Sequence, residues 1–362
     1  MTKKTICVVG SGWGACSFVK SIDTTKFNVI IVAPDCNFLY TPLLPFSMFN
    51  KIALTIPAVS LNENISVCKH NVVNVNTESN TLILDNDKNL VYDIVVFSHG
   101  ASVNTFNIQG VDKFCEFIKY TNDIQEIQEK LQQLNNQAKV VVIGCGPTGV
   151  ETIGHLIDNG TYDITAIDAL ERPLSMYPNK AVEYLFGVWE ENQVHYKMAS
   201  PVTKITKDTI HTKNGNVVYD IAFWCGGIKP NTLTSTIMNN LGHKRIPGIP
   251  VNNFLQIKSG SSFIKNVYAI GDCSLGFGPP TAQKAYQQGK YLADSINRDT
   301  QYPFAYHSKG QITYIGDKKS VFTSPYFNTY GRIAGLINKG IMIYNSISLQ
   351  QMKNICKAYI EK

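Results

Sequence analysis

Residues 5–15 read TICVVGSGWGA, and this stretch decides the fold. The apolar run Ile6–Val9 is typical of a buried strand, a glycine-rich turn follows it, and residues 17–22 (SFVKSI) have helical spacing. Gly10 permits a tight turn, Gly12 lets the backbone approach a pyrophosphate, and Ala15 lets the helix pack close to the strand. The N–H groups at the start of the helix then face the ligand, so the stretch predicts a dinucleotide-binding βαβ unit.

The same pattern occurs a second time at residues 139–157. A strand at 139–143 leads into the turn GCGPTG at 144–149, and helical spacing follows at 150–157. One G-x-G-x-x-G motif is weak evidence, but two of them, each between a strand and a helix, are strong. We therefore expect an α/β protein with two Rossmann-like dinucleotide-binding domains, the first discontinuous in sequence, and a short C-terminal helical tail.

Linkers suggest where the chain crosses between the two domains. A polar stretch at 132–137 (QQLNNQ) precedes the second glycine motif and is the first predicted linker. A Pro/Gly cluster at 241–250 is the second, and the predicted strand after it ends just before Gly271 and Asp272. The predicted ranges are 1–110 and 246–322 for the first domain, 111–245 for the second, and 323–362 for the C-terminal segment.

Composition excludes several classes of protein. The formal net charge of +6 is mild, and no nucleic-acid-binding motif accompanies it, so no nucleic-acid partner is expected. The N-terminus runs at once into the strand Ile6–Val9, so we expect neither a signal peptide nor a transit peptide. The nine cysteines are scattered without C-x-x-C spacing, which predicts reduced thiols and no metal site.

The residue at the end of the second strand of a dinucleotide-binding unit selects the nucleotide, and in the first unit Ala33 stands there in place of an acid, with Asp35 two residues further on. In the second unit this residue is Asp168, whose carboxylate can accept from both ribose hydroxyls and would repel a 2′-phosphate. The pattern therefore favours NADH over NADPH. Two alternatives stay open: Arg172 is close enough in sequence to hold a phosphate, and Asp168 could be a solvated turn residue.

Several motifs together resemble the type II NADH dehydrogenases, the single-subunit NADH:quinone oxidoreductases. The resemblance rests on the first glycine turn, on FLYTPLLP at 38–45, on GPTGVE at 146–151, on AIGD at 269–272 and on TAQKAYQQG at 281–289. It implies that the first turn holds FAD and the second NADH. The implied FAD-binding residues are Gly10, Gly12, Trp13, Gly14, Ala15, Pro42, Gly100, Asp272, Ala282 and Gln283. The implied NADH-binding residues are Gly144, Gly146, Pro147, Thr148, Gly149, Asp168 and Gly226.

The resemblance further implies hydride transfer from NADH to the flavin and two-electron transfer to a quinone, without proton pumping. Gln283 and Gln287 match the family's Ala-Gln-x-x-x-Gln pattern at the quinone site, and their spacing places both on one helix face. Without the match to the family, the two residues would be interpreted as solvated glutamines on the surface of a helix. Glu151 matches a family glutamate between the two cofactors, and stabilisation of an anion by the helix dipole explains it equally well.

The C-terminal segment from Gly331 mixes apolar residues at helical spacing with lysines and one arginine. Such a pattern fits an interfacial helix on anionic lipid, and the family resemblance implies a peripheral protein on the cytoplasmic side of a membrane. A homodimer face and a helix packed on the core remain alternatives.

Two other functions stay open. One is a soluble NADH-oxidising flavoprotein that uses another acceptor, and the other is an NADH-responsive flavoprotein resembling apoptosis-inducing factor. The C-x-x-x-x-C redox pair of the disulfide reductases does not occur in the chain, which favours electron transfer without a cysteine relay.

Overall fold

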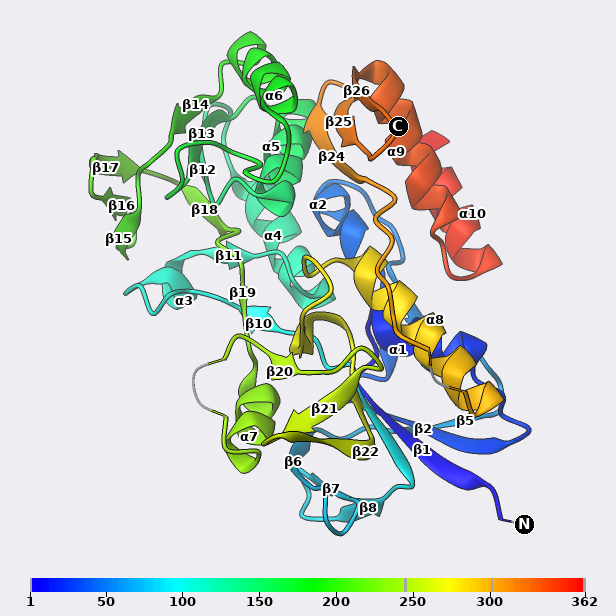
Figure 1. Cartoon of the computed structure of the whole chain (residues 1–362). Helices are drawn as coiled ribbons and strands as arrows, with labels where there is room; N and C mark the ends of the chain where they lie inside the picture. Colours follow the sequence, from blue (N-terminus) through cyan, green and yellow to red (C-terminus); the bar gives the residue numbers. More distant parts are fainter. Residues whose placement is uncertain (1, 244–245, 301, 361–362) are drawn as a thin grey trace. The chain divides into compact units, whose positions relative to one another are not determined.

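A computed structural model describes residues 2–243, 246–300 and 302–360 (Figure 1). The chain forms two compact units. Unit 1 comprises residues 1–39, 55–102 and 229–308, and unit 2 comprises residues 40–54, 103–228 and 309–362. The short strands β10 (Ser102–Val103) and β19 (Ile228–Lys229) span two of the boundaries between these segments.

Unit 1 is built on a six-stranded sheet in the order β21-β22-β9-β1-β2-β5. All neighbours pair in parallel except β21 and β22, which are antiparallel. The predicted strand–turn–helix is confirmed, with the glycine turn between β1 and α1. The bounds are β1 Lys4–Val9, α1 Trp13–Ser21, β2 Phe27–Val32, β5 Ile65–Cys68, β9 Ile94–Phe97, β21 Gln256–Ser259 and β22 Ser262–Ala269.

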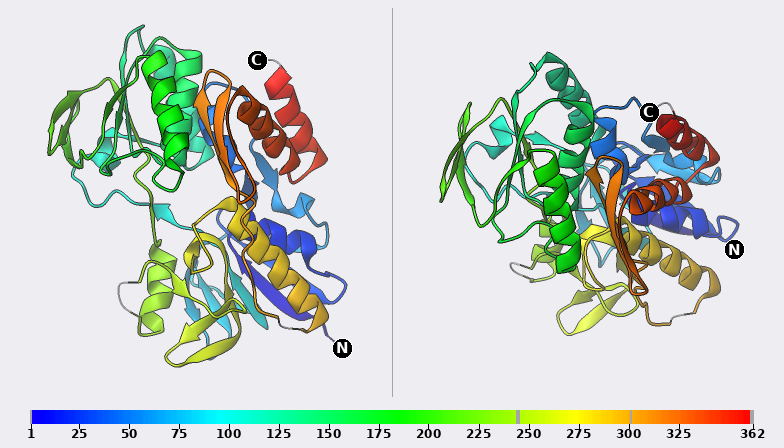
Figure 2. Two further views of the ribbon diagram at one scale, coloured as in Figure 1. Left: turned by 45° about the horizontal axis from the view of Figure 1, so that its top comes forward. Right: turned by 90° about the horizontal axis from the view of Figure 1, so that it is seen from above.

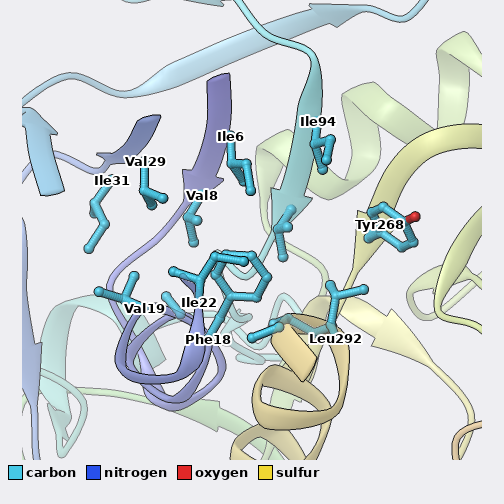
Figure 3. Close-up of a cluster of buried hydrophobic side chains, with 14 of the residues drawn as sticks. Ile6, Val8, Phe18, Val19, Ile22, Val29, Ile31, Ile94, Tyr268 and Leu292 are labelled. Carbon is cyan, nitrogen blue, oxygen red and sulfur yellow. The ribbon is translucent and has the colours of Figure 1, made fainter. Parts of the chain in front are cut away.

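Helices α1 and α8 (Ala282–Arg298) pack against each other on one face of this sheet. Figure 3 shows Phe18 of α1 and Leu292 of α8 directed at the strand residues Ile6 and Val8, all of them buried. Hydrophobic burial of this layer fixes where α1 begins relative to β1. It therefore positions the glycine turn.

Smaller elements complete unit 1. Three further sheets are the antiparallel pair β3-β4, the antiparallel ladder β6-β7-β8 and the parallel pair β20-β23, and helix α7 packs on β6. Their bounds are β3 Asn37–Leu39, β4 Thr55–Pro57, η2 Ala58–Ser60, β6 Val72–Asn76, β7 Thr81–Leu84, β8 Asn89–Val91, α7 Thr232–Asn240, β20 Ile249–Pro250, η3 Gly271–Cys273 and β23 Ser274–Leu275.

Unit 2 contains a five-stranded parallel sheet in the order β11-β18-β12-β13-β14. The second predicted strand–turn–helix is confirmed as β12 and α5. The bounds are β11 Glu116–Phe117, β12 Lys139–Ile143, β13 Asp163–Ile167, β14 His195–Lys197, β18 Ile221–Trp224, α3 Val111–Phe114, α4 Thr121–Gln133, α5 Pro147–Asn159 and α6 Asn179–Glu191. A three-stranded ladder follows, β15 Val202–Ile205, β16 Thr209–Thr212 and β17 Gly215–Val218.

The C-terminal part of unit 2 forms a second sheet and two helices. Strands β24 (Gln311–Gly316), β25 (Lys319–Thr323) and β26 (Asn328–Gly331) are antiparallel. Helix α5 packs on β24, and α9 (Arg332–Tyr344) packs on β25 (Figure 2). Helix α10 (Leu349–Ile360) contacts α9, and the segment 40–54 adds η1 (Thr41–Leu43) and α2 (Leu44–Ser47), which contacts α5.

The compact units divide the chain differently from the ranges expected from sequence. Helix α7 belongs to unit 1 because it packs on β6, whereas the expected second domain extended to residue 245. Residues 309–322 belong to unit 2 because β24 packs on α5, whereas the expected first domain ran to residue 322.

Candidate functional site

The first glycine turn leaves room for a ligand at the N-terminus of α1. Gly10 has a φ of +106°, and a Cβ there would collide with the Ser98 carbonyl oxygen, so only glycine fits. A Cβ on Gly12 would meet nothing within 4 Å, which leaves open space beside the helix start. Among the described residues no side-chain hydrogen bond caps α1, and a helix start of this kind suits an anionic group such as a pyrophosphate.

The other residues expected at this site are also placed in unit 1, apart from Pro42. Trp13 packs edge-on against Phe38 with ring centroids 5.0 Å apart, and Ala15 is fully buried. Gly100 has a φ of +67° and open space at its Cβ position. Asp272 lies in η3, which packs on α8, and Ala282 is the first residue of α8.

Three further polar residues of unit 1 were missed by the sequence analysis. Gln288 is fully buried and accepts a hydrogen bond from the Gly271 N–H at 2.8 Å, while its Nε2 has no partner within the described part of the chain. His99 bonds Thr234 Oγ1 through Nε2 at 2.8 Å, and burial lowers its pKa to about 3. Burial also lowers the pKa of Lys284, which the charge of Asp272 opposes.

These three residues adjoin positions that the resemblance assigns to FAD, and their chemistry fits that group. A buried amide N–H and a buried ammonium are donors that require a partner, and a polar, phosphate-bearing cofactor supplies acceptors. For Lys284 and Gln288, the sequence signal that could have revealed them is the presence of charged and amide side chains on the apolar face of α8. Lys284 and Gln288, four residues apart, lie on the buried side of that helix.

The second glycine turn repeats the construction in unit 2. Gly144 has a φ of +93°, and a Cβ there would lie 2.5 Å from the Cys225 carbonyl oxygen. A Cβ on Gly146 would meet nothing within 4 Å, and Pro147 begins α5, where its missing N–H costs nothing. Thr148 is exposed at the same helix start, whereas a Cβ on Gly149 would collide with Gly144 and one on Gly226 would press on the Trp224 ring.

Asp168 organises this second turn. Its carboxylate accepts the Cys145 N–H at 2.6 Å and the Leu170 N–H at 2.8 Å, so it ties the end of β13 to the glycine loop. A carboxylate has four lone-pair sites, so two backbone bonds leave acceptor capacity for ribose hydroxyls. The guanidinium of Arg172 donates to Asn179 Oδ1 and to the carbonyl oxygens of Ser175 and Tyr177. These hydrogen bonds hold the Arg172 guanidinium within the segment 172–179.

The two glutamines expected at the quinone site have different environments. The amide of Gln287 forms two bonds with the backbone of His307, donating to its carbonyl oxygen at 2.9 Å and accepting from its N–H at 3.0 Å. This pairing gives Gln287 a structural role in fixing the chain after α8. Gln283 is half-buried and accepts a hydrogen bond from the Tyr306 hydroxyl at 3.1 Å.

A cavity of about 540 Å³ lies within unit 2, and it contains Glu151. Its apolar walls come from the segment 40–54 and the C-terminal helices, and its polar groups come largely from α5 and the β24–β25 turn. The lining residues are Pro42, Leu43, Phe46, Glu151, His155, Asp158, Asn159, Tyr314, Asp317, Lys318, Gly335, Asn338, Lys339, Met342 and Tyr359. Pro42, expected to contact FAD, thus lines this cavity.

Glu151 is the strongly perturbed acid of the cavity. Burial raises the pKa of its carboxyl to about 8, and a hydrogen bond from the Tyr314 backbone N–H opposes the shift. A carboxyl with that pKa is protonated at neutral pH, so Glu151 is a hydrogen-bond donor and a candidate general acid.

All nine cysteines are free. Burial raises the pKa of the Cys225 and Cys273 thiols to about 12, so neither is a reactive thiolate. No group of three or more metal-binding side chains occurs among the residues that the structure describes.

Comparisons with known proteins agree with this geometry. The family model for pyridine nucleotide-disulphide oxidoreductases matches residues 4–289. A probable mitochondrial NADH-ubiquinone oxidoreductase of Schizosaccharomyces pombe is 27% identical, with 88% of this chain and 66% of the relative aligned. The external NADH-ubiquinone oxidoreductase 2 of Saccharomyces cerevisiae is 28% identical, over 83% of this chain and 64% of its own. The chain thus spans about two thirds of the length of these relatives.

A solved structure extends the match over almost the whole fold. The NDH2 of Plasmodium falciparum in complex with NADH superposes with a TM-score of 0.92 at 20% identity, covering 99% of this chain and 98% of that one. The sulfide:quinone oxidoreductase of Aquifex aeolicus has the same fold, with a TM-score of 0.81 at 16% identity and coverage of 97% and 92%. The chain belongs to the pyridine nucleotide-disulphide oxidoreductase family.

Proposed function

We propose that the chain is an FAD-dependent enzyme that takes hydride from NADH and passes two electrons to a quinone. One observation carries the proposal. Two glycine turns of the same construction lie on two separate sheets, each with open space at its middle glycine and an uncapped helix start. Two dinucleotide sites in one chain suit electron transfer from one nucleotide to the other. The names of the relatives, NADH-ubiquinone oxidoreductases, support a quinone as the final acceptor.

The residues of each unit match the cofactor assigned to it. In unit 1 the N-terminus of α1 would hold the FAD pyrophosphate, Asp272 would accept from FAD hydroxyl groups, and Lys284 would add positive charge beside it. In unit 2 the N-terminus of α5 would hold the NADH pyrophosphate and Asp168 its ribose. Bound FAD supplies the two-electron chemistry. The chain binds and orients both nucleotides, and Arg172 is unavailable for a 2′-phosphate.

The cavity of unit 2 is the proposed acceptor site. Its volume falls in the range of small-molecule sites, and its mixture of apolar walls with a few polar groups suits a quinone ring. The protonated Glu151 carboxyl would donate a hydrogen bond to a quinone oxygen. Gln283 remains a candidate contact to FAD or the acceptor, while the backbone pairing of Gln287 favours a positioning role.

An anaerobic titration of the purified holoprotein tests the function. NADH should bleach the visible absorption of the bound flavin, and a short-chain ubiquinone should restore it under anaerobic conditions. If oxygen restores the flavin absorption and quinone has no effect, the protein is an NADH oxidase and the proposal is wrong. Bleaching that persists for many minutes with either acceptor would favour an NADH-responsive flavoprotein.

Variants of the two glutamines test the roles proposed for their contacts. Gln283→Leu should slow reoxidation by quinone more than bleaching by NADH, since it removes an amide without touching a nucleotide-binding glycine. Gln287→Leu should instead lower thermal stability, because two backbone groups of His307 lose their partner. Equal slowing of both half-reactions by Gln283→Leu would exclude a role of that amide in quinone reduction.

The C-terminal helices are the proposed contact with a membrane surface. Large apolar side chains are exposed on α9 and α10, namely Ile333, Leu336, Tyr344, Leu349 and Ile360, each more than 60% accessible. Lys353 and Lys357 are exposed on α10. No helix in the described ranges is long and apolar enough to span a bilayer. Apolar residues beside lysines suit the interface of an anionic bilayer, which would make the protein peripheral.

Vesicle sedimentation tests this surface. The wild-type protein should co-sediment with vesicles that contain anionic lipid, and the double variant Ile333→Glu, Leu336→Glu should not. Loss of binding at high salt is expected for the lysine contribution. A different result would contradict the membrane contact: the wild type does not bind vesicles and is a dimer in sedimentation equilibrium, whereas the double variant is a monomer. The exposed apolar residues of α9 and α10 would then contact a second copy of the chain.

A further inference from the structure

One face of α5 carries three titratable side chains in a row. Glu151, His155 and Asp158 are spaced four and three residues apart, which stacks them along one side of the helix, and all three line the cavity. Asp158, in the last turn, is exposed, whereas His155 is buried with 8% of its surface accessible. The row thus leads from solvent at the helix end to the acid in the cavity.

Tyr314 of β24 runs alongside this row and contacts each member. Its backbone N–H donates to the Glu151 carboxyl group, and its ring stacks on the His155 imidazole with centroids 4.7 Å apart and planes at 23°. Its hydroxyl donates to Asp158 Oδ2. Asp158 Oδ1 accepts the Asp317 N–H at 2.8 Å, so the carboxylate is fixed at the mouth of the row. One residue of the neighbouring strand therefore holds all three side chains in position.

We propose that Asp158, His155 and Glu151 form a proton-delivery route from solvent to the acceptor cavity, with Tyr314 as the residue that aligns them. This inference rests on the proposed function, because a route for protons is needed only if a quinone is reduced there. The route uses a group at the surface, a buried imidazole that can accept and release a proton, and an acid in contact with the cavity.

The stoichiometry of the reaction requires such a route. NADH supplies two electrons and one proton as hydride, whereas the quinol has gained two electrons and two protons. One proton per turnover must therefore come from solvent: NADH + H⁺ + quinone gives NAD⁺ + quinol. Glu151 gives its proton to the quinone oxygen and becomes a carboxylate, His155 gives a proton to that carboxylate, and solvent restores the proton on His155 past Asp158.

The groups around the row set its electrostatics. Burial keeps the Glu151 carboxyl protonated at neutral pH, so Glu151 already carries the proton for the quinone before the quinone binds. The ammonium of Lys339 lies over the Tyr359 ring at 5.3 Å, and Phe46 packs edge-on against His155. The titratable or charged groups that face the row from the other elements are Tyr177, Tyr314, Asp317, Lys318, Lys339 and Tyr359.

The experiment compares two acceptors in the flavin-loaded protein. Ubiquinone reduction consumes protons, whereas ferricyanide accepts electrons without protons. His155→Gln and Asp158→Asn should each slow ubiquinone reduction about a hundredfold or more, the lower end of what a positioned proton-transfer group contributes. Both variants should leave ferricyanide reduction within about twofold of the wild type. Added imidazole should restore quinone reduction in His155→Gln. The matched control His211→Gln, on β16 outside the cavity, should change neither rate.

The outcomes separate the route from the proposed function. A wild-type protein that reduces ferricyanide but not ubiquinone would refute the proposed function and the route with it. A wild-type protein that reduces ubiquinone, with equal rates in both variants, would refute the route alone. Equal slowing of both acceptors, without rescue by imidazole, would assign the row a structural role. If His155→Gln does not fold, the exposed position of Asp158 allows Asp158→Asn to decide between these outcomes.

Discussion

Replacing Glu151 by glutamine should change how the stability of unit 2 depends on pH. Burial raises the pKa of this carboxyl from 4.5 to about 8. Between these two values the folded protein binds more protons than the unfolded chain, so its free energy of unfolding falls as pH rises. The stabilising contribution is fully present below about pH 4.5 and is lost as pH rises through about 8. The glutamine variant has no such ionisation, so this dependence should disappear.

The size of the effect follows from the shift. Each pH unit inside the window changes the free energy of unfolding by about 1.4 kcal/mol. From about pH 5.5 to 7.5, Glu151→Gln should therefore gain about 2 to 3 kcal/mol relative to the wild type. Urea unfolding followed by tryptophan fluorescence is a suitable assay, because Trp189 and Trp224 both lie in unit 2.

The outcome that would refute this reasoning is a constant difference between the two proteins at every pH. Such a result would mean that the carboxyl ionises in the folded protein much as it does in the unfolded chain. Glu151 would then be a carboxylate at neutral pH, and its role as a proton donor in the cavity would be lost. A conservative control is Glu190→Gln, which makes the same chemical change at an exposed residue of α6.

Three further predictions concern the nucleotide sites. Gly289→Ala places a methyl group against the Gly14 carbonyl oxygen and should separate α8 from α1, with a loss of about 1 to 3 kcal/mol of stability and of bound flavin, measured by thermal unfolding and flavin absorbance. Gln288→Leu leaves the buried Gly271 N–H without its partner and should cost about 1 to 3 kcal/mol, measured in the same way. Asp168→Ala frees two loop N–H groups and should weaken NADH binding by about tenfold or more, measured as Kd, while NADPH binding changes less.

The parts of the fold that sequence predicted are those set by local chemistry. A buried strand, a glycine turn and a helix start are neighbours in the chain, so β1 with α1 and β12 with α5 could be placed from a few residues each. The backbone demands at Gly10 and Gly144 are equally local, because each needs a positive φ where its strand ends.

The cavity could not be predicted, because it is assembled from distant segments. Phe46, Glu151, Tyr314 and Tyr359 come from four separate parts of the chain, and only tertiary packing brings them together. The β24–β26 sheet shows the same limit: residues 311–322 were expected in the first domain and β26 in the C-terminal segment, but β24 packs on α5. Gln287 illustrates the converse. Its motif suggested a ligand contact, while its amide pairs with a backbone twenty residues away.

Glu151 shows how two physical effects compete at one position. The dipole of a helix favours an anion near its N-terminus, but this effect falls off beyond the first turn, and Glu151 is the fifth residue of α5. Burial in the cavity acts on the same carboxyl with the opposite sign and is the larger effect, since the pKa rises. One helix could therefore use its first turn to hold an anionic nucleotide and its next turn to keep an acid protonated. That separation would let α5 serve both the proposed nucleotide binding and the proposed proton supply.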